Sequence, residues 1–380
     1  MHNPYLQLFR KYSRQMTIAH AVVLVIVFIL SWLIIQVRTK VNTGDTPISV
    51  YIDKDDTQDS VRIKVGNPHG WGLLHWYFDA TPRTGHYLIA PKERVLSVYR
   101  KLRNGTQSPI KLTIPQVRTM DMMATYLSKH LMLDSATIVE AFRSQEFCEK
   151  YGYTTQTLPA LFIANTYEIW WNTSLENFML RMQKENERFW NPTRHKKAQD
   201  MKFTHEQVIT LASIVAEETS YIPEMPRVAG MYIRRLQIGM PLQADPTVKF
   251  AVGDFSLRRI YHHHLKTPSP YNTYLNRGLP PGPIRVPSTR TIDAVLNYEQ
   301  HNYLYMCAKE DFSGSHNFAR TYSEHLSNAR RYTNALNRRK RRYDPPLTLP
   351  VREGAYDNTF QVSLISSNIL LRPLASSCVL

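Results

Sequence analysis

The sequence predicts an α+β protein with an N-terminal transmembrane helix, a small α/β module and a larger, mainly helical domain with a few strands. Three observations support this prediction. Residues 17–36 are almost wholly apolar, residues 42–118 contain short segments with the two-residue period of strands, and residues 119–337 show mainly helical periodicity. Residues 338–380 begin with the basic run RRKRR, continue as a tail without a clear period, and are left unassigned.

Composition narrows the class of protein. An apolar content of 43% and 22 tyrosines favour a packed globular chain over a disordered one. The formal net charge of +16 would suit nucleic acid, but no helix-turn-helix, zinc-finger or RNP-like pattern accompanies it, so we expect no nucleic-acid partner. An anionic lipid surface suits the same charges better. The cysteines Cys148, Cys307 and Cys378 lack metal-ligand spacing, and their odd number gives no disulfide framework.

The apolar segment at 17–36 is long enough to cross a membrane, since about 18 to 20 apolar residues span a bilayer core as a helix. A cleaved signal peptide is the alternative, but no small-x-small cleavage site follows, so we expect an uncleaved single-pass anchor. Basic residues flank the segment on both sides. Residues 1–16 are short and lack acidic side chains, which favours a cytoplasmic N-terminus.

The module at 42–118 combines strands with a helix. Its predicted strands are ISVYID (48–53), SVRIKV (60–65), HYLIA (86–90) and IKLTI (110–114). Between the last two, ERVLSVYRKLRNG (93–105) predicts a helix that Gly105 closes.

The domain at 119–337 opens with helical patterns. These lie at 120–133, 137–151 and 174–190. Phe178, Met179 and Met182 recur at helical spacing in the last one, and we expect them to be core residues rather than chemical groups. A further helix is predicted between Pro226, which suits a first turn, and Gly239, which suits a C-terminal cap.

A helix beginning near residue 204 carries the candidate catalytic group. Thr204 followed by Gln207 predicts a capping box, and apolar residues then recur at helical spacing. At roughly 100° per residue, Glu218 falls on this apolar face, whereas its neighbour Glu217 is turned away from it. The two adjacent glutamates are therefore not equivalent.

A carboxyl group on an apolar face has two explanations, because burying an unpaired charge is costly. It forms an ion pair, here with Arg234 or Arg235 of the next predicted helix, or its surroundings keep it partly neutral, which makes it a proton donor near neutral pH. For a lone glutamate the structural pair is favoured by roughly two to one. The surrounding motifs must decide between them.

A turn-rich segment, PSPYNTYLNRGLPPGPIRVPST (268–289), is neither helix nor central strand, since its prolines lack backbone donors. Its residues Tyr271, Asn272, Thr273 and Tyr274 suit sugar binding, because aromatic faces pack on pyranose rings while amides and hydroxyls match sugar hydroxyls. An ordered scaffolding loop is the commoner meaning of such a composition.

Three further groups bear on the prediction of site residues. Asp245 precedes Pro246, which predicts an N-cap with proline at the first helical position and makes Asp245 the weaker candidate for a second catalytic carboxylate. The consecutive histidines 262–264 point in different directions, unlike a zinc-binding i, i+4 pair, so no metal site is predicted. His316 is a candidate substrate contact or an equally common structural histidine.

Five segments together resemble the MltG/YceG family of endolytic murein transglycosylases, in order and at similar separations. They are SIVAEET (213–219), RVAGMYIRRLQIGMPLQADPTVKF (227–250), PYNTYLNRGLPPGPI (270–284), YLYM (303–306) and SHNFARTYSEH (315–325). The resemblance extends from about residue 83 to about residue 337. Residues 84–115 are similar to the family's LysM-like module, which is thought to hold glycan, although an ordinary strand–helix packing unit is as frequent an explanation.

The resemblance implies roles for individual residues. Glu218 occupies the position of the catalytic glutamate, in a motif where Ala216 replaces an earlier glutamate of the family pattern. Gln243, Asp245, the four residues 271–274 and His316 are implied to contact the substrate. This chain departs from the family at Asn165, which replaces an aspartate, and at Val286–Ser288, where Asn-Pro-Gly is common.

The implied reaction is cleavage of the MurNAc–GlcNAc bond in nascent glycan strands, with one glutamate acting as acid and then as base and no cofactor. A single glutamate of raised pKa meets this need. The resemblance also implies a catalytic domain outside the cytoplasmic membrane and penicillin-binding synthases as partners. Two alternatives stay open: a hydrolase that adds Asp245 or Glu217 as second carboxylate, and a non-catalytic wall-binding scaffold.

Overall fold

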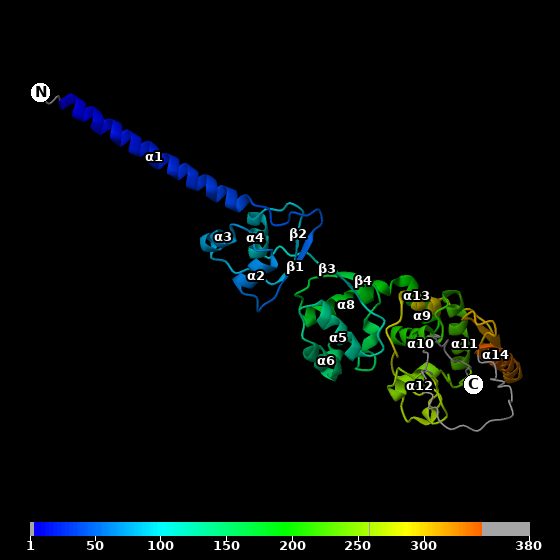
Figure 1. Cartoon of the computed structure of the whole chain (residues 1–380). Coiled ribbons are helices and arrows are strands. Elements are labelled where there is room, and N and C mark those ends of the chain that lie inside the picture. Colours follow the sequence, from blue (N-terminus) through cyan, green and yellow to red (C-terminus); the bar gives the residue numbers. More distant parts are fainter. Residues whose placement is uncertain (1–3, 258, 344–380) are drawn as a thin grey trace, which may run out of the picture. The chain divides into compact units, whose positions relative to one another are not determined.

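The computed structural model describes residues 4–257 and 259–343 (Figure 1). Helices and strands both occur, so the prediction of a mixed helix-and-strand structure is confirmed. Contacts divide the chain into two compact units. The first comprises Met1–Leu112, Leu127–Asp134 and Tyr167–Leu175, and the second comprises Thr113–Tyr126, Ser135–Thr166 and Glu176–Leu380.

The first element is a long helix, α1 (Pro4–Arg38). Its portion Gln15–Arg38 is long and apolar enough to cross a membrane, with a mean hydropathy of 2.9, and none of it is buried within the protein. The predicted apolar helix is therefore present, and it extends beyond both ends of the apolar stretch.

The rest of the first unit is built on a two-stranded sheet. β1 (Ile48–Ile52) and β2 (Gly85–Ile89) run antiparallel, with Val50 opposite Tyr87. Three helices pack with them: α2 (Gln58–Lys64), α3 (Trp71–Phe78) and α4 (Val95–Asn104). A second two-stranded sheet joins β3 (Ile110–Thr113) and β4 (Thr166–Ile169).

The strand predicted at 60–65 is wrong, because these residues lie in α2 and its C-terminal cap. The Thr57 side chain accepts a hydrogen bond from the backbone N–H of Ser60, which starts a helix. Val61 and Val65, one helical turn apart, are both buried. The helix α3 was not predicted, since its run of apolar residues has no clear period. The other strands of the module and the helix closed by Gly105 are confirmed.

From the end of β3 onward the chain is mainly helical, and most of these helices belong to the second unit. In chain order from the end of β3, the helices are α5 (Met120–His130), α6 (Ser135–Arg143), α7 (Gln145–Glu149), α8 (Leu175–Phe189), α9 (Pro192–Asp200), α10 (His205–Glu218), α11 (Met225–Gln237), α12 (Asp245–Val252), α13 (Thr289–Leu296) and α14 (Tyr322–Tyr343). Short 3-10 turns occur at Leu158–Leu161, Ile222–Glu224 and His264–Lys266. β5 (Tyr305–Ala308) and β6 (His316–Ala319) form an antiparallel pair.

The helix α10 is the centre of this unit. Every residue from Val208 to Val215 is buried, and α10 packs against α11, α12 and α13, which surround it in Figure 1. The predicted capping box is confirmed, since Thr204 and Gln207 exchange side-chain-to-backbone hydrogen bonds of 3.2 and 2.9 Å. A central helix with a fixed start holds its last residue, Glu218, in a defined place.

Other helical predictions are also confirmed. The patterns at 120–133, 137–151 and 174–190 correspond to α5, to α6 with α7, and to α8, and Phe178, Met179 and Met182 are buried. Pro226 lies in the first turn of α11, and Gly239 follows its end with a φ of +67°. The segment 268–289 contains neither helix nor strand before Thr289. Residues 344–380 lie outside the described part of the chain.

Candidate active site

Glu218 is a buried carboxyl group with one satisfied oxygen. Its side chain belongs to a residue that is 4% exposed. Oε1 accepts a hydrogen bond of 2.7 Å from the hydroxyl of Tyr232 in α11. Oε2 is buried and has no hydrogen-bond partner among the described residues. An unpaired buried carboxyl oxygen is costly as an anion and much less so when it carries the proton.

Burial raises the pKa of Glu218 from 4.5 to about 7. The hydrogen bond from Tyr232 opposes this shift, because it stabilises the ionised form. The carboxylate of Asp245 raises the pKa further, whereas His316 and Arg235 lower it. The net result is a carboxyl group that exchanges its proton near neutral pH.

The ion pair considered for Glu218 does not form. Arg235 is fully buried, and its guanidinium donates instead to the carbonyl oxygens of Leu304 at 2.6 Å and Leu242 at 2.7 Å. Among the described residues, neither Arg234 nor Arg235 forms a salt bridge with Glu218. The proton-donor explanation is the one that fits this geometry.

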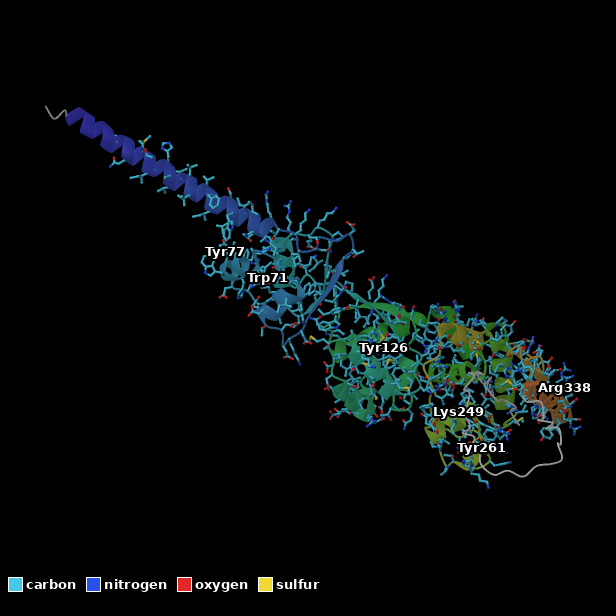
Figure 2. The ribbon with its side chains drawn as sticks, viewed as in Figure 1. Trp71, Tyr77, Tyr126, Lys249, Tyr261 and Arg338 are labelled. Atoms are coloured by element: carbon cyan, nitrogen blue, oxygen red, sulfur yellow. The ribbon has the colours of Figure 1, made fainter. Side chains whose placement is uncertain are left out.

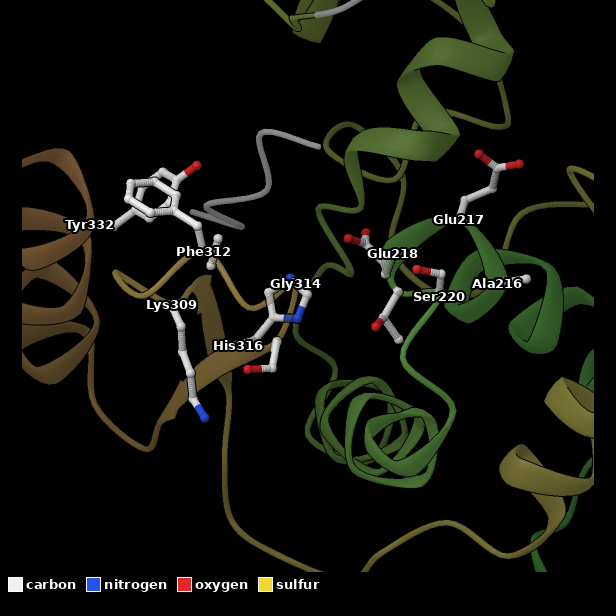
Figure 3. A pocket seen from close by; sticks show the side chains of 12 residues that line it. Ala216, Glu217, Glu218, Ser220, Lys309, Phe312, Gly314, His316 and Tyr332 are labelled. Carbon is white, nitrogen blue, oxygen red and sulfur yellow. The ribbon is translucent and has the colours of Figure 1, made fainter. Parts of the chain in front are cut away.

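Glu217 has the opposite environment, as its predicted orientation requires. Arg118 donates to both of its carboxylate oxygens, at 3.0 and 2.9 Å, and Arg285 donates to Oε1 at 2.9 Å. Two guanidinium groups thus pair with Glu217, which gives this residue a structural explanation. In Figure 3 its carboxylate points away from Glu218 and His316.

Glu218 lies at the wall of a hollow with a volume of about 220 Å³. Residues from α10 and its end, from the β5–β6 hairpin and from α14 line this hollow: Ala216, Glu217, Glu218, Thr219, Ser220, Ala308, Lys309, Phe312, Gly314, Ser315, His316 and Tyr332. Figure 3 shows Glu218 and His316 facing each other across it, with Phe312 and Tyr332 at the far side. The hollow offers access to an otherwise buried acid.

His316 is fixed by a carboxylate that sequence reasoning missed. Its backbone N–H donates to Oε1 of Glu224, and its Nδ1 lies 2.8 Å from Oε2 of the same residue. Both residues are buried, at 7% and 6% exposure. Glu224 thus fixes both the backbone and the imidazole ring of His316. No local sequence signal joins these residues, which are 92 positions apart.

The prediction that Asp245 is an N-cap is wrong. Ala244 is the N-cap of α12, Asp245 is the first helical residue, and no side-chain cap bond forms there. The carboxylate accepts a hydrogen bond of 2.7 Å from the hydroxyl of Tyr274, and burial raises the pKa of Asp245. Because its charge acts on Glu218, Asp245 belongs to the same electrostatic site.

The remaining predicted site residues divide into two groups. Tyr274 reaches the site through Asp245, whereas Asn272 and Thr273 are buried inside the loop. The Asn272 amide donates to the carbonyls of residues 265 and 267 at 3.0 and 2.9 Å. The Thr273 hydroxyl accepts from the N–H of residue 244 at 3.0 Å. Both side chains therefore hold the loop in place.

Gln243 and Tyr271 lie around this loop. Gln243 has a left-handed backbone with a φ of +48°, and its N–H donates to the carbonyl of Thr273 at 3.1 Å. Tyr271 packs on Phe250 and lines a different hollow, together with Arg118. The structure thus brings Glu218, Asp245, Tyr274 and His316 together through contacts or charge, and leaves Tyr271 apart.

Metal ligation has no obvious site in the described residues, where no group of three or more His, Cys, Asp or Glu side chains is arranged to hold an ion. In the consecutive histidines, His264 Nδ1 accepts from the backbone N–H of Tyr261 at 3.1 Å.

The chain is similar to a family profile, to curated proteins and to a solved structure. Residues 65–331 match the profile described as the YceG-like family. A protein of Bacillus subtilis (strain 168) named endolytic murein transglycosylase is 33% identical over 166 residues, which cover 44% of this chain and 45% of that protein. A protein of the same name from Streptococcus pneumoniae serotype 2 is 26% identical over 285 residues, covering 67% of this chain and 51% of that protein.

The chain spans about half the length of these curated relatives. The crystal structure of a yceG-like protein from Listeria monocytogenes superposes with a TM-score of 0.52 at 24% identity, and covers 75% of this chain and 99% of that one. At this identity the likeness concerns the fold.

Proposed function

Because the chain belongs to the YceG-like family, we propose that it is a lytic transglycosylase that cuts within peptidoglycan glycan strands. Curated relatives named endolytic murein transglycosylase support the activity and the substrate class. The observation that carries the proposal is the environment of Glu218: a buried carboxyl of pKa about 7, with one oxygen unpaired, at the wall of an open hollow.

The proposed reaction needs one such group. Protonated Glu218 donates its proton to O4, the oxygen that bridges MurNAc C1 and GlcNAc C4. The C1–O4 bond breaks, and positive charge develops on the muramoyl ring. The resulting carboxylate then removes the proton of the MurNAc C6 hydroxyl, whose oxygen bonds to C1. The products are a 1,6-anhydroMurNAc end and a free GlcNAc 4-hydroxyl, and Glu218 has recovered its proton.

The neighbouring groups have separable roles in this scheme. Tyr232 orients the carboxyl group through its hydrogen bond to Oε1, and Oε2 then carries the proton that is transferred. The negative charge of Asp245 favours the protonated acid before the first step. His316, held by Glu224, lies across the hollow and is placed to contact the sugar.

The rival enzyme is a hydrolase. It would need a second carboxylate to activate water. Glu217 is a poor candidate, because two arginines occupy its oxygens. Asp245 is then the candidate for the second carboxylate of a hydrolase. A non-catalytic scaffold would require the raised pKa of Glu218 to have no chemical use.

The family relationship and α1 together support a cellular placement. We propose that α1 crosses the cytoplasmic membrane once, with residues 1–16 in the cytoplasm and the remainder on the outer side. Within the remainder we assign residues 42–118 to a LysM-like glycan-holding module and 119–337 to the catalytic domain. Penicillin-binding synthases are the proposed protein partners, and no cofactor is required.

Mass analysis of fragments released from purified glycan strands tests the proposal. The full chain in detergent is compared with Glu218→Gln and with the control Glu206→Gln, which changes a carboxylate in the first turn of the same helix. We expect 1,6-anhydro ends from wild type and control, and at least a roughly hundredfold loss of release in Glu218→Gln. Folding of the variant is checked by circular dichroism.

The other outcomes separate the rivals. Hydrated reducing ends from the wild type would replace the transglycosylase by a hydrolase, with Asp245→Asn as the next variant. No release by any protein, with binding to wall material retained, would leave the scaffold. Equal anhydro release by wild type and Glu218→Gln would remove Glu218 from the mechanism.

A further inference from the structure

The short helix α3 exposes aromatic side chains that its own unit does not cover. Trp71 and Leu74 of α3 are buried in the first unit's core, but Trp76 is 79% exposed and Tyr77 is 72% exposed. These values equal or exceed the 72% exposure of Phe28 in the apolar part of α1. Figure 2 labels Trp71 and Tyr77 on this helix. Exposed aromatic groups of this size call for a partner.

The start of α3 is fixed to the end of α1. The hydroxyl of Thr39 lies 2.8 Å from the carbonyl oxygen of Gln36 and 3.1 Å from that of His69. Gly70, the N-cap of α3, has a φ of +80°, and a Cβ there would lie 2.6 Å from the Gln36 carbonyl oxygen. Only glycine permits this approach. The last turn of α1 and the first turn of α3 are therefore in direct backbone contact.

The connection after α1 is also paired with the first unit. Val41 donates its N–H to the carbonyl of Glu93, and Val95 donates to that of Thr39, at 2.8 and 2.9 Å. Lys40 and Arg94 are opposite each other in an isolated antiparallel bridge. These hydrogen bonds restrict rotation of the unit about the end of α1, so the start of α3 stays next to the end of the apolar helix.

Charge near this junction is mainly basic. Arg38 ends α1, and Lys40 and Arg94 follow at the bridge. The nearby acid Glu93 is paired with Lys101 at 2.9 Å, and another acid, Asp79, is the C-cap of α3. Tryptophan and tyrosine are enriched at membrane–water interfaces, and basic residues there attract anionic headgroups.

We propose that α3 is an interfacial helix that inserts Trp76 and Tyr77 into the headgroup region of the bilayer that α1 crosses. Its partner is an anionic lipid surface. The inference rests on the proposed membrane anchor, but not on the reaction at Glu218. It gives the first unit a second attachment to the membrane and so limits the orientation of this unit at the surface.

Quenching of tryptophan fluorescence by brominated lipid tests the inference. The full chain is reconstituted in vesicles of phosphatidylethanolamine and brominated phosphatidylglycerol, with unbrominated vesicles as reference. The background variant Trp32→Phe removes the tryptophan of the apolar helix. In that background, Trp76→Phe is compared with Trp170→Phe, which removes another exposed tryptophan of the same unit.

We expect bromine-dependent quenching to persist in Trp32→Phe and in Trp32→Phe/Trp170→Phe, and to be lost in Trp32→Phe/Trp76→Phe. Persistence of quenching after removal of Trp76, or its absence from the Trp32→Phe background, would overturn the inference. The wild type separates this from failure of the anchor. If Trp32 is quenched and Trp76 is not, α1 is in the membrane and α3 is not; if neither is quenched, both proposals fall.

Discussion

Glu217 and Glu218 are adjacent in sequence and opposite in chemistry. Two arginine side chains neutralise Glu217, whereas Glu218 has a phenol on one oxygen and no partner on the other within the described residues. A change of one position along a helix rotates a side chain by about 100°, from an ion-paired face to a buried one. The environment, and not the residue type, assigns the proton.

The stability of the protein should therefore depend on pH through Glu218. Its pKa is about 7 in the folded state and near 4.5 when unfolded, so the folded protein binds the proton more tightly. This contribution is fully present below pH 4.5 and is lost as the pH rises through 7. We expect Glu218→Gln, which does not titrate, to gain stability relative to wild type over this range, by at most about 3 kcal/mol.

Urea unfolding at several pH values between 4.5 and 8 measures this difference. Glu206→Gln, in the first turn of the same helix, serves as control and should run parallel to wild type. If the difference between Glu218→Gln and wild type is independent of pH, the shifted pKa is wrong.

Glu224 should matter for stability although it does not face the hollow. Glu224→Ala leaves both the backbone N–H and the Nδ1 of His316 without an acceptor, which should cost about 2 to 4 kcal/mol. Glu224→Gln keeps one acceptor oxygen and should cost less. Glu299→Ala is the control, since it removes the exposed pair with Arg227 at a cost below about 1 kcal/mol. Denaturant unfolding compares the three variants. Equal losses of unfolding free energy would show that Glu224 contributes no more than an exposed ion pair does.

At the scale of elements, the local sequence predicted a helix correctly where its apolar period and its capping residues agree. The capping box of α10 and its apolar period predicted both the helix and the side on which Glu218 lies. The module's segment 60–65 satisfied a strand period but also followed a Thr57 cap, and the helix prevailed because Val61 and Val65 are both buried by it. Short segments admit both periods, and tertiary burial decides between them.

The candidate site was predictable only in part. Glu218 was found from its own helix, with its role supplied by family resemblance. Tyr232, which lies 14 residues further on, becomes its partner only because α10 packs on α11. Glu224 and His316 meet across 92 residues, and Asp245 was misread because the aspartate–proline pair has a common local explanation. Packing brings these groups together, and no local period encodes it.

Gly230 in α11 lies too close to a neighbouring backbone segment to carry a side chain without a shift. A Cβ on Gly230 would lie 2.1 Å from the carbonyl oxygen of Glu299. Glycine to alanine in a helix normally stabilises by about 0.5 to 1 kcal/mol. Here we expect Gly230→Ala to destabilise by about 1 to 3 kcal/mol, because backbone must move. Gly72→Ala in α3, with nothing within 4 Å of the added atom, should not destabilise. Thermal unfolding measures both, and a neutral Gly230→Ala would show that the segment after α13 yields easily.

At the scale of the whole molecule, each of the two units has a hydrophobic core of its own. The core of the first unit contains Leu102, and that of the second contains Ile292. Chains with several cores commonly depart from two-state unfolding. We expect calorimetry of the full chain in detergent to resolve two transitions.

Two core variants assign these transitions. Leu102→Ala and Ile292→Ala each remove a buried side chain, at an expected cost of about 2 to 5 kcal/mol. Each should lower one melting temperature and leave the other in place. A single transition that both variants lower equally would show that the units unfold together.

The place of Glu218 as the last residue of α10 has one more consequence. The aligned peptide dipoles of a helix leave a partial negative charge, equivalent to roughly half an electron, at its C-terminal end. A carboxylate there meets the field of its own helix, in addition to the loss of water. The backbone therefore favours the neutral acid however the side chains around it change, and the same glutamate in the first turn of α10 would meet a field of the opposite sign.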